Sequence, residues 1–252
     1  MNNRPVETED EGQDLIIGRN AVTEAVKGGR EIDTLFIANG DRSGSIGMIM
    51  GLAREKGIVV KEVDRRKLDA MCGGGNHQGV AARAAAHKYA EVDDIIAAAK
   101  EKGEEPFVVI CDEIEDPHNL GAIIRTADAC GAHGVIIPKR RGVSLTYAVG
   151  KVSAGAVEYV PVARVTNLPS TIEELKSKGF WLYGADMDGT PWDKQDYSGA
   201  VALVVGSEGR GISRLVKEKC DFIVSLPMKG KINSLNASVA AGILMYEVTK
   251  HR

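Results

Sequence analysis

Three segments in the second half of the chain place polar residues and glycines where a predicted strand passes into a predicted helix. Their sequences are NLGAIIRTADACG (residues 119–131), LVVGSEGRGIS (203–213) and LPMKGKINSLNAS (226–238). In open α/β sheets, ligands bind at the ends of strands, where helices begin. These segments are therefore the first places to look for a binding or catalytic site.

Arg125 in the first segment is a cation on the polar side of a predicted helix, which Asn119 is expected to cap. Small residues beside Arg125 leave its guanidinium room to reach a ligand. The apolar stripe of the same helix is formed by Leu120, Ile123, Ile124 and Ala127. The alternative for Arg125 is a surface ion pair with Asp128, which would contribute at most about 1 kcal/mol.

The second segment is a glycine-rich turn between a predicted strand and a predicted helix, and backbone amides in such a turn can hold a polar ligand. Its glycines follow the order GxxGxG from Gly206 to Gly211, whereas a nicotinamide-binding domain has GxGxxG. Val205 stands two residues before Ser207, where the nucleophile elbow of a hydrolase requires glycine. The turn therefore argues against both enzyme classes.

The third segment carries Ser234 and Asn236 directly before a predicted apolar helix. Capping of that helix is the structural explanation of both side chains. Gly242 inside the helix costs about 1 kcal/mol relative to alanine. We therefore expect Gly242 to lie close to another backbone, either within the fold or across a dimer.

In order and wording, the three segments resemble the motifs of SpoU-type methyltransferases of the SPOUT class. These enzymes transfer a methyl group from S-adenosylmethionine to the 2'-oxygen of an RNA ribose. The resemblance implies S-adenosylmethionine as cofactor, a catalytic domain with a trefoil knot near its C-terminus, and a homodimer. It implies catalytic roles for Asn119, Arg125, Glu208, Ser234 and Asn236. It implies cofactor contacts for Gly206, Leu226, Met228, Leu235 and Asn236.

The chemistry of ribose methylation determines the roles that those residues would have. A ribose hydroxyl is a weak nucleophile that develops negative charge as it attacks, so catalysis needs a charge stabiliser and a proton acceptor. Arg125 is the best stabiliser, because a guanidinium stays protonated. Glu208, a backbone carbonyl or water would take the proton. The reaction requires no metal. The acids Asp112, Glu113, Glu115 and Asp116 are expected to be solvated side chains next to a turn. The alternative for them is a magnesium site.

Residues 14–86 show a shorter α/β pattern that resembles the small ribosomal-protein-like RNA-binding domain found in front of many SpoU-type catalytic domains. The shared residues are Gly18, Arg19, Asn20 and Val22 at the start and His77, Gln78, Gly79 and Val80 at the end. This resemblance implies RNA contacts from Arg19, His77 and Gln78. A basic cluster at Arg140 and Arg141 is a further RNA-binding candidate.

The spacing of apolar residues predicts the elements that position these segments. Residues 1–13 carry acids, Asn, Gln and Pro with almost no apolar side chain to bury, and are expected to be a disordered tail. In residues 14–86 we predict helices over 15–26 and 45–56 and strands over 34–38, 58–63 and 79–85. A connector over 87–105 contains a charged helix. In residues 106–252, six strands are predicted at 107–110, 134–137, 157–162, 180–183, 201–205 and 222–226.

Strands that are apolar on both faces indicate a sheet covered by helices on each side. Pattern alone therefore predicts an α/β domain with a mainly parallel, doubly wound sheet, because knots are rare. The resemblance replaces the open sheet by a knotted SPOUT fold.

Composition excludes several classes. The 252 residues are 44% hydrophobic, which suits a globular protein, and no apolar run is long enough to cross a membrane. A cytoplasmic protein is expected by default. With 32 Lys and Arg against 35 Asp and Glu, the net charge of -3 gives no global attraction to phosphate, so RNA would be held by local patches.

The arrangement of two domains most resembles the family members that methylate a guanosine of 23S ribosomal RNA, with the transfer RNA enzymes as the alternative. Two rivals from other classes stay open on the residues alone. One is an RNA-binding protein without catalysis, and the other is a nucleotide-dependent oxidoreductase. Cofactor binding separates them.

Overall fold

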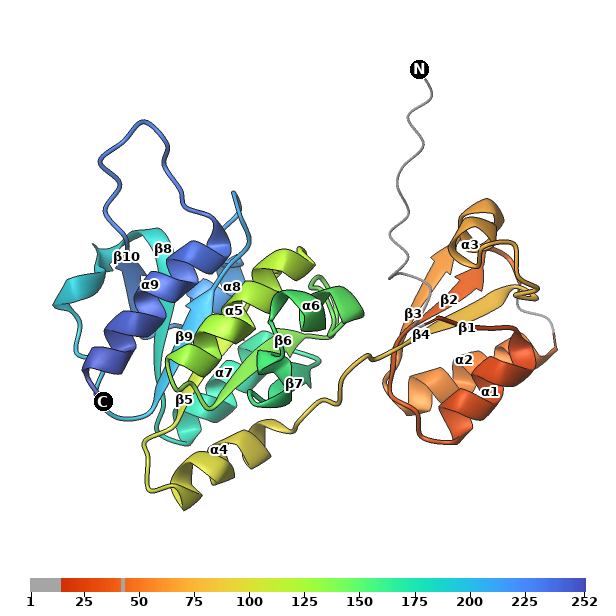
Figure 1. Ribbon diagram of the computed structural model, residues 1–252, viewed down its shortest axis with the longest axis horizontal. Helices are drawn as coiled ribbons and strands as arrows, with labels where there is room; N and C mark the ends of the chain where they lie inside the picture. The colour runs from red at the N-terminus through yellow and green to blue at the C-terminus, as the bar shows by residue number, and fades with distance from the viewer. Residues whose placement is uncertain (1–14, 42–43) are drawn as a thin grey trace. The chain divides into compact units, whose positions relative to one another are not determined.

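The computed structural model describes residues 15–41 and 44–252, so the predicted tail over residues 1–13 lies outside the described part. The chain divides after Lys88 into two compact units, each with its own core. Both units are α/β (Figure 1).

The first unit is a mixed four-stranded sheet in the order β1-β4-β2-β3. β4 runs antiparallel to β1 and β2, whereas β2 and β3 are parallel. Its strands are β1 (Leu15–Ile17), β2 (Ile32–Ala38), β3 (Val59–Val63) and β4 (Val80–Ala84). Its helices are α1 (Arg19–Lys27), α2 (Ser45–Glu55) and α3 (Arg65–Met71). Helices α1 and α2 share one core with the sheet, and α3 buries Leu68 in a second, smaller one.

The prediction that the first helix includes Leu15 and Ile16 is wrong. These residues pair with β4 as strand β1, and Gly18, with φ +90°, separates the strand from the helix. An apolar dipeptide next to a helix fits either element, and only its pairing partner, about 65 residues later, decides between them.

The second unit has a six-stranded sheet in the order β10-β8-β9-β5-β6-β7 with every neighbouring pair parallel. Its strands are β5 (Phe107–Cys111), β6 (Gly134–Pro138), β7 (Val162–Val165), β8 (Trp181–Pro191), β9 (Val201–Val205) and β10 (Phe222–Ser225). Its helices are α4 (Val92–Glu101), α5 (Pro117–Ala129), α6 (Tyr147–Val152), α7 (Leu168–Ser177), α8 (Arg214–Lys217) and α9 (Ala237–Lys250). The predicted parallel α/β sheet is confirmed, and the knot stays a prediction.

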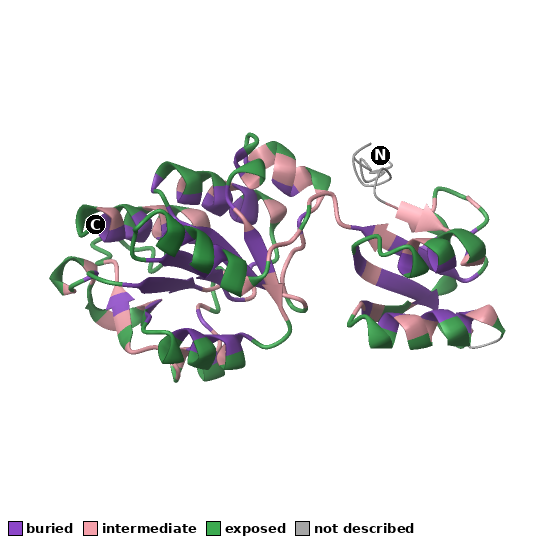
Figure 2. Cartoon of the chain, turned by 90° about the horizontal axis from the view of Figure 1, so that it is seen from below, coloured by how far each residue is buried: buried purple, intermediate pink, exposed green. Residues whose placement is uncertain are grey.

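Helices cover both faces of this sheet, which is why its central strands are buried throughout (Figure 2). Val109 and Cys111 of β5 face the core that α5, α6 and α9 share, whereas Val108 and Ile110 face the core that α4, α7 and α8 share. Successive residues of a strand point to opposite faces, so an uninterrupted apolar strand needs cover on both.

Two predicted elements of this unit differ in detail. The helix expected within the connector is α4, which buries Ile95 against the sheet and so belongs to the second unit. Residues 157–162 were expected to form a strand, but Ala156–Glu158 is a 3-10 helix and β7 begins only at Val162. The left-handed conformations of Ala154 (φ +52°) and Gly155 (φ +88°) turn the chain there, so the apolar Val160 fills the core from a turn.

Strand β8 is longer than predicted because part of it leaves the ladder. Gly184 pairs with Ile223 of β10, but the next residue of β10 pairs with Thr190, so residues 185–189 bulge out of the sheet. A Cβ atom on Gly189 would come within 2.6 Å of the backbone of Ile223. Glycine therefore permits the return of the strand, and the bulge places polar residues beside the end of β9.

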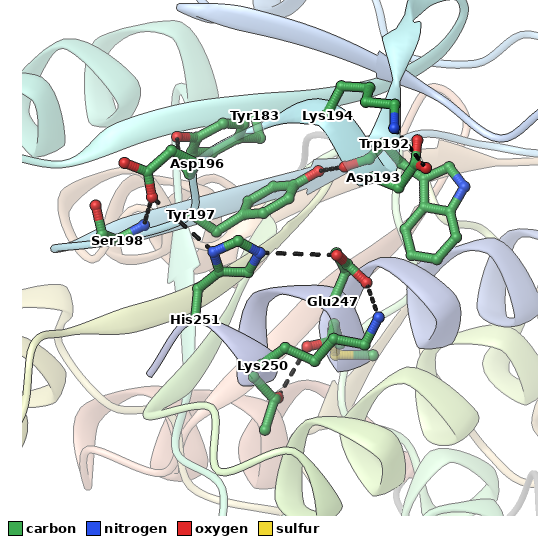
Figure 3. Close-up of polar contacts among 12 residues, drawn as sticks. Tyr183, Trp192, Asp193, Lys194, Asp196, Tyr197, Ser198, Glu247, Lys250 and His251 are labelled. Atoms are coloured by element: carbon green, nitrogen blue, oxygen red, sulfur yellow. Dashed lines mark hydrogen bonds and ion pairs between the residues drawn. The ribbon is translucent and has the colours of Figure 1, made fainter.

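The C-terminal end of α9 is anchored by a polar and aromatic cluster (Figure 3). Glu247 lies 2.5 Å from Lys250 Nζ and 3.7 Å from His251 Nε2, and its side chain is buried. The ring of Tyr197 packs edge-on against His251 and its hydroxyl donates to the Trp192 carbonyl at 2.9 Å. The N-terminal end of the same helix lies at the candidate site.

Candidate functional site

Helix α5 brings the first segment to the carboxyl edge of the sheet. Asp116 caps the helix, because its Oδ1 accepts from the His118 amide at 2.9 Å, and Pro117 occupies the first position. The prediction that Asn119 is the cap is wrong. Asn119 lies in the first turn, so its side chain is free to point across to the neighbouring loop.

Helix α9 brings the third segment to the same edge. Asn236 caps this helix: its Oδ1 accepts from the amides of Ser238 (3.0 Å) and Val239 (3.3 Å). Since those amides can only donate, the Nδ2 of Asn236 must face away from the helix. It donates to Asn119 Oδ1 at 2.9 Å and also to Glu208. Capping and participation in the site are therefore both true of Asn236.

Glu208 joins the three segments into one network. Its Oε1 accepts from Asn119 Nδ2 at 3.2 Å, from the Ala237 amide at 3.3 Å and from Asn236. Within residues 15–41 and 44–252, no group forms a hydrogen bond or ion pair with Oε2, and the side chain is exposed. One carboxylate oxygen thus fixes the position of Glu208, and the other is open to a ligand.

The glycine turn that carries Glu208 is held by its own backbone. The amides of Ser207 and Gly211 donate to each other's carbonyls at 3.1 and 2.9 Å. A Cβ on Gly206 would lie 2.1 Å from the carbonyl carbon of Gly211. Glycine at this position is therefore required by the turn before any ligand is considered. Buried Asp112 fixes the end of the turn by accepting from the Ser213 amide at 2.7 Å.

A cavity of about 560 Å³ opens beside this turn. Four of the five predicted cofactor residues, Gly206, Leu226, Met228 and Leu235, line it together with Ser234, and Asn236 stands at its edge next to Ala237. Its volume lies within the usual range for cofactor sites, roughly 300–1,000 Å³. Ser207 Oγ is buried in its wall with no hydrogen-bond partner among the described residues, and a ligand would satisfy such an atom. Its lining combines apolar residues with charged ones such as Asp186, Glu208 and Lys217, and this mixture fits a nucleoside joined to an amino acid.

Sequence reasoning missed the charged side of this cavity. Lys217 of α8 lies 3.1 Å from Asp186 and 3.6 Å from Asp188, both in the β8 bulge. The hydrogen bond that the Lys217 ammonium donates to Asp186 is the main cause that raises the pKa of Lys217, so the ammonium stays protonated. Only the register of β8 against β10 brings these residues to the site, and the sequence carries no signal of that register.

Arg125 is the predicted catalytic residue that the fold of one chain does not bring to the network. It lies on the exposed side of α5 and lines no part of the cavity. Among the described residues it forms no ion pair, so the alternative of a pair with Asp128 is wrong. Its guanidinium is available to a group from outside the chain.

In the first unit, the predicted RNA contacts meet at one turn. Arg19 Nε donates to the Gln78 carbonyl at 2.9 Å, the Arg19 amide donates to Gln78 Oε1 at 3.2 Å, and Asp41 accepts from the Arg19 guanidinium. His77 is buried: its Nδ1 accepts from the Gly79 amide, and its Nε2 lies 2.7 Å from Asp69. His77 therefore supports the turn, whereas Arg19 and Gln78 reach the surface.

The basic cluster of the second unit lies in the loop after β6. Arg140 and Arg141 are both exposed, and Arg141 Nη1 donates to Glu113 at 3.4 Å. The acids expected as a possible magnesium site hold other partners: Glu113 and Glu115 face arginines, and Asp116 caps α5. No cluster that could hold a metal ion occurs in the part of the chain that the structure describes.

Comparison with known families follows the division into two units. Residues 106–246, more than half of the chain, match the family model of the SpoU rRNA Methylase family. The chain belongs to this family. Residues 15–90 match the family model for RNA 2'-O ribose methyltransferase substrate binding. The resemblance that the three segments predicted is confirmed.

Individual relatives agree along nearly the whole length. YacO of Bacillus subtilis, named for the TrmH family of tRNA/rRNA methyltransferases, is 54% identical over 95% of this chain and 96% of its own. The SpoU methyltransferase AviRb of Streptomyces viridochromogenes, solved with S-adenosylmethionine, has a TM-score of 0.58 at 26% identity, covering 94% of this chain and 89% of its own. An S-adenosylmethionine-bound rRNA methyltransferase of Sinorhizobium meliloti has a TM-score of 0.59 at 26% identity, covering 94% and 87%.

This protein is therefore an S-adenosylmethionine-dependent RNA 2'-O-ribose methyltransferase. The oxidoreductase and the RNA-binding protein without catalysis are set aside. No helix among the described residues is long and apolar enough to span a membrane.

Proposed function

We propose that this enzyme methylates the 2'-hydroxyl of a guanosine ribose in 23S ribosomal RNA, with transfer RNA as the alternative substrate, and that it works in the cytoplasm. The observation that carries the transfer site is the Asn119–Glu208–Asn236 network beside the cavity of about 560 Å³. The choice of ribosomal RNA rests on the order of a substrate-binding unit before a methyltransferase unit along the chain, and on the two structural relatives whose names concern SpoU or rRNA methylation.

S-adenosylmethionine bound in the cavity supplies a methyl group made electrophilic by its sulfonium. The Oε2 atom of Glu208, which has no hydrogen-bond partner among the described residues, would accept the proton of the ribose hydroxyl. Asn119 and Asn236 hold Glu208 through its other oxygen, and Ser234 lines the cavity beside them. A guanidinium, Arg125, stabilises the negative charge that develops on the attacking oxygen.

We further propose a homodimer in which Arg125 acts on the partner's site. Helices α5 and α9 share an exposed apolar face with a hollow that Ala122, Thr126 and Gly242 line. A Cβ on Gly242 would meet only Thr126 Cγ2 at 3.7 Å. The expected close backbone is thus absent among the described residues of the same chain, which leaves the dimer. Val239, Ile243 and Tyr246 on this face are also exposed.

A division of labour between the two units is proposed for RNA binding. The net charge of -3 leaves RNA affinity to local groups, and Arg19 with Gln78 in the first unit and Arg140 with Arg141 in the second provide them. Residues 14–86 would choose the RNA, residues 106–252 would transfer the methyl group, and residues 87–105 would join them.

The substrate is tested by mapping. Ribose methylation of ribosomal and transfer RNA is compared between a strain that carries the gene and a deletion strain, and the purified enzyme is then assayed on the RNA that lost a methyl group. We expect one guanosine of 23S ribosomal RNA to lose its 2'-O-methyl group. Loss only from transfer RNA would select the alternative, and loss from neither would contradict the proposed substrate.

The dimer and the division of labour have separate tests. Ile243→Asp should give a monomer in sedimentation velocity that still binds S-adenosylmethionine but has lost turnover. Deletion of residues 1–88 should leave a second unit that binds the cofactor with little RNA affinity. A dimeric Ile243→Asp variant, or a truncated protein with full RNA affinity, would contradict the respective proposal.

A further inference from the structure

Two arginines converge on one carboxylate beside the network. Glu113 lies in the loop after β5, and its Oε1 accepts from Arg141 Nη1 at 3.4 Å. Its Oε2 lies 3.7 Å from Arg210 Nη1, while Arg210 Nη2 donates to Glu115 at 3.1 Å. Arg141 follows β6 and Arg210 follows β9, so Glu113 connects two loops that are distant in the sequence.

The exposure of these side chains separates an inner anion from two outer cations. The side chain of Glu113 is 17% exposed, whereas those of Arg141 and Arg210 are 80% and 65% exposed. A guanidinium has five N–H donors in a fixed fork, and the contacts to Glu113 and Glu115 use a minority of them. The remaining donors face solvent, in the arrangement by which arginine binds phosphate oxygens.

Two of the three residues in this bridge of Glu113, Arg141 and Arg210 have a strained, left-handed backbone. Glu113 has φ +56° and Arg141 has φ +60°, and only two other described non-glycine residues have a positive φ. Such conformations cost free energy, persist only where the surroundings hold them, and cluster at functional sites. An ordinary surface ion pair does not require a left-handed conformation in both partners.

The bridge also stands next to the transfer site. A small cavity of about 160 Å³ is lined by Glu113, Glu115 and Arg210 together with Asn119 and Glu208. Because one turn carries both Glu208 and Arg210, a ligand at the Glu208 carboxylate lies beside the Arg210 guanidinium. For an RNA substrate, the negative groups next to the reacting ribose are its own flanking phosphates.

We propose that Arg141 and Arg210 form a phosphate-binding site for the RNA backbone next to the methylated ribose, and that Glu113 is the positioning residue that holds both. The inference rests on the proposed function, since it needs an RNA at the transfer site. It explains how a chain of net charge -3 attracts phosphate where the reaction occurs.

Salt dependence tests the two arginines. Binding of deproteinised 23S ribosomal RNA and of bulk transfer RNA is measured by filter binding across a salt series for Arg141→Gln and Arg210→Gln. Each substitution should weaken binding and lower the salt slope by about one phosphate contact. Lys219→Gln is the matched control, because Lys219 is also a cation paired with a carboxylate, Glu173, but lines neither cavity of the site. It should keep the slope.

The direction in which RNA affinity changes in Glu113→Gln tests the role of Glu113. If Glu113 merely repels phosphate, Glu113→Gln should bind RNA more tightly, because a negative charge is removed. If it positions the arginines, the variant should bind RNA more weakly and lose roughly ten-fold in kcat/KM, as expected when a charged hydrogen-bonding partner is lost. Affinity for S-adenosylmethionine should not change. Glu173→Gln serves as the control that removes the same charge elsewhere.

Unchanged salt slopes in both arginine variants, or tighter RNA binding by Glu113→Gln, would overturn the inference. Thermal unfolding shows whether each variant is folded, and if Glu113→Gln is not, the two arginine variants decide. A wild-type enzyme that binds RNA but does not methylate a ribose would contradict the proposed function instead, since the slopes would still report phosphate contacts.

Discussion

Each end of α9 carries a polar cluster built around one glutamate, and the two glutamates differ in exposure and in their partners. At its start, Glu208 accepts hydrogen bonds through one oxygen and is exposed, with its second oxygen unoccupied among the described residues. At its end, Glu247 is buried, and Lys250 and His251 contact both of its oxygens. A carboxylate whose every partner comes from the protein stabilises the fold, whereas one that keeps an atom in reserve beside a cavity can act on a ligand.

The surroundings of the two clusters follow the same division. The end of α9 is packed with aromatic rings, and burial first, then Asp196, raises the pKa of Tyr183 to about 12 (Figure 3). The centres of the Tyr183 and Tyr197 rings lie 4.6 Å apart. At the start of α9, the contacting residue Glu208 instead belongs to a glycine turn and lines two cavities. Variants at the two ends should therefore separate activity from stability.

The largest expected effect is at the start of α9. Glu208→Gln keeps the size of the side chain but removes its charge and the proton-accepting oxygen, so methyl transfer should fall by roughly 10²-fold or more. The free energy of unfolding and the affinity for S-adenosylmethionine should change little. Turnover on RNA and calorimetry with the cofactor measure these quantities. Wild-type turnover would remove Glu208 from the mechanism.

A second prediction concerns whether Arg125 acts with Glu208 of its own chain or of the partner chain. Arg125→Ala alone should lower turnover by about 10²-fold, because a preorganised charge stabiliser is lost. If Arg125 acts on the partner's site, an equal mixture with Glu208→Gln should recover about a quarter of wild-type turnover, since half of the dimers then hold one complete site. A mixture with no recovery would place both residues in the same chain's site.

A third prediction concerns the buried end of α9. Glu247→Gln removes the anion that Lys250 and His251 contact and should lower the free energy of unfolding by about 1–3 kcal/mol. Urea unfolding measures this change. Cofactor affinity should match that of the wild type, because Glu247 does not line the cofactor cavity. A loss of cofactor affinity without a loss of stability would reverse the proposed roles of the two ends.

The smallest expected effect is a pH dependence of stability from His133. Burial lowers the pKa of this imidazole, against the opposing effect of Glu104, and its Nδ1 accepts from the Phe107 amide at 3.0 Å. The fold therefore favours neutral His133, and its contribution is complete above about pH 6.5, the unfolded value. It is lost as the pH falls below that value toward the folded pKa. Urea unfolding at pH 7.5 and 5.5 should show a difference that shrinks in His133→Asn.

Some elements and site residues could be predicted from the sequence, and others could not. Alternation-free apolar runs predicted the buried parallel strands, because a strand covered on both faces must be apolar throughout. The three segments predicted that Asn119, Glu208 and Asn236 belong to one site, since parallel strands end at a common edge, and the structure adds the hydrogen bonds among them. Residues 157–162 were misassigned because an apolar turn and an apolar strand have the same composition, and only pairing distinguishes them.

By itself, the sequence determined the family, the parallel sheet and the loops that carry the site, because these depend on residue type and on spacing along the chain. Only the tertiary structure decided that Oε1 of Glu208 is used and Oε2 is left open, that the β8 bulge brings Asp186 to Lys217, and that Glu113 holds Arg141 and Arg210. Those contacts depend on strand register and on loops meeting across the sheet. Such long-range geometry has no local signal in a single sequence.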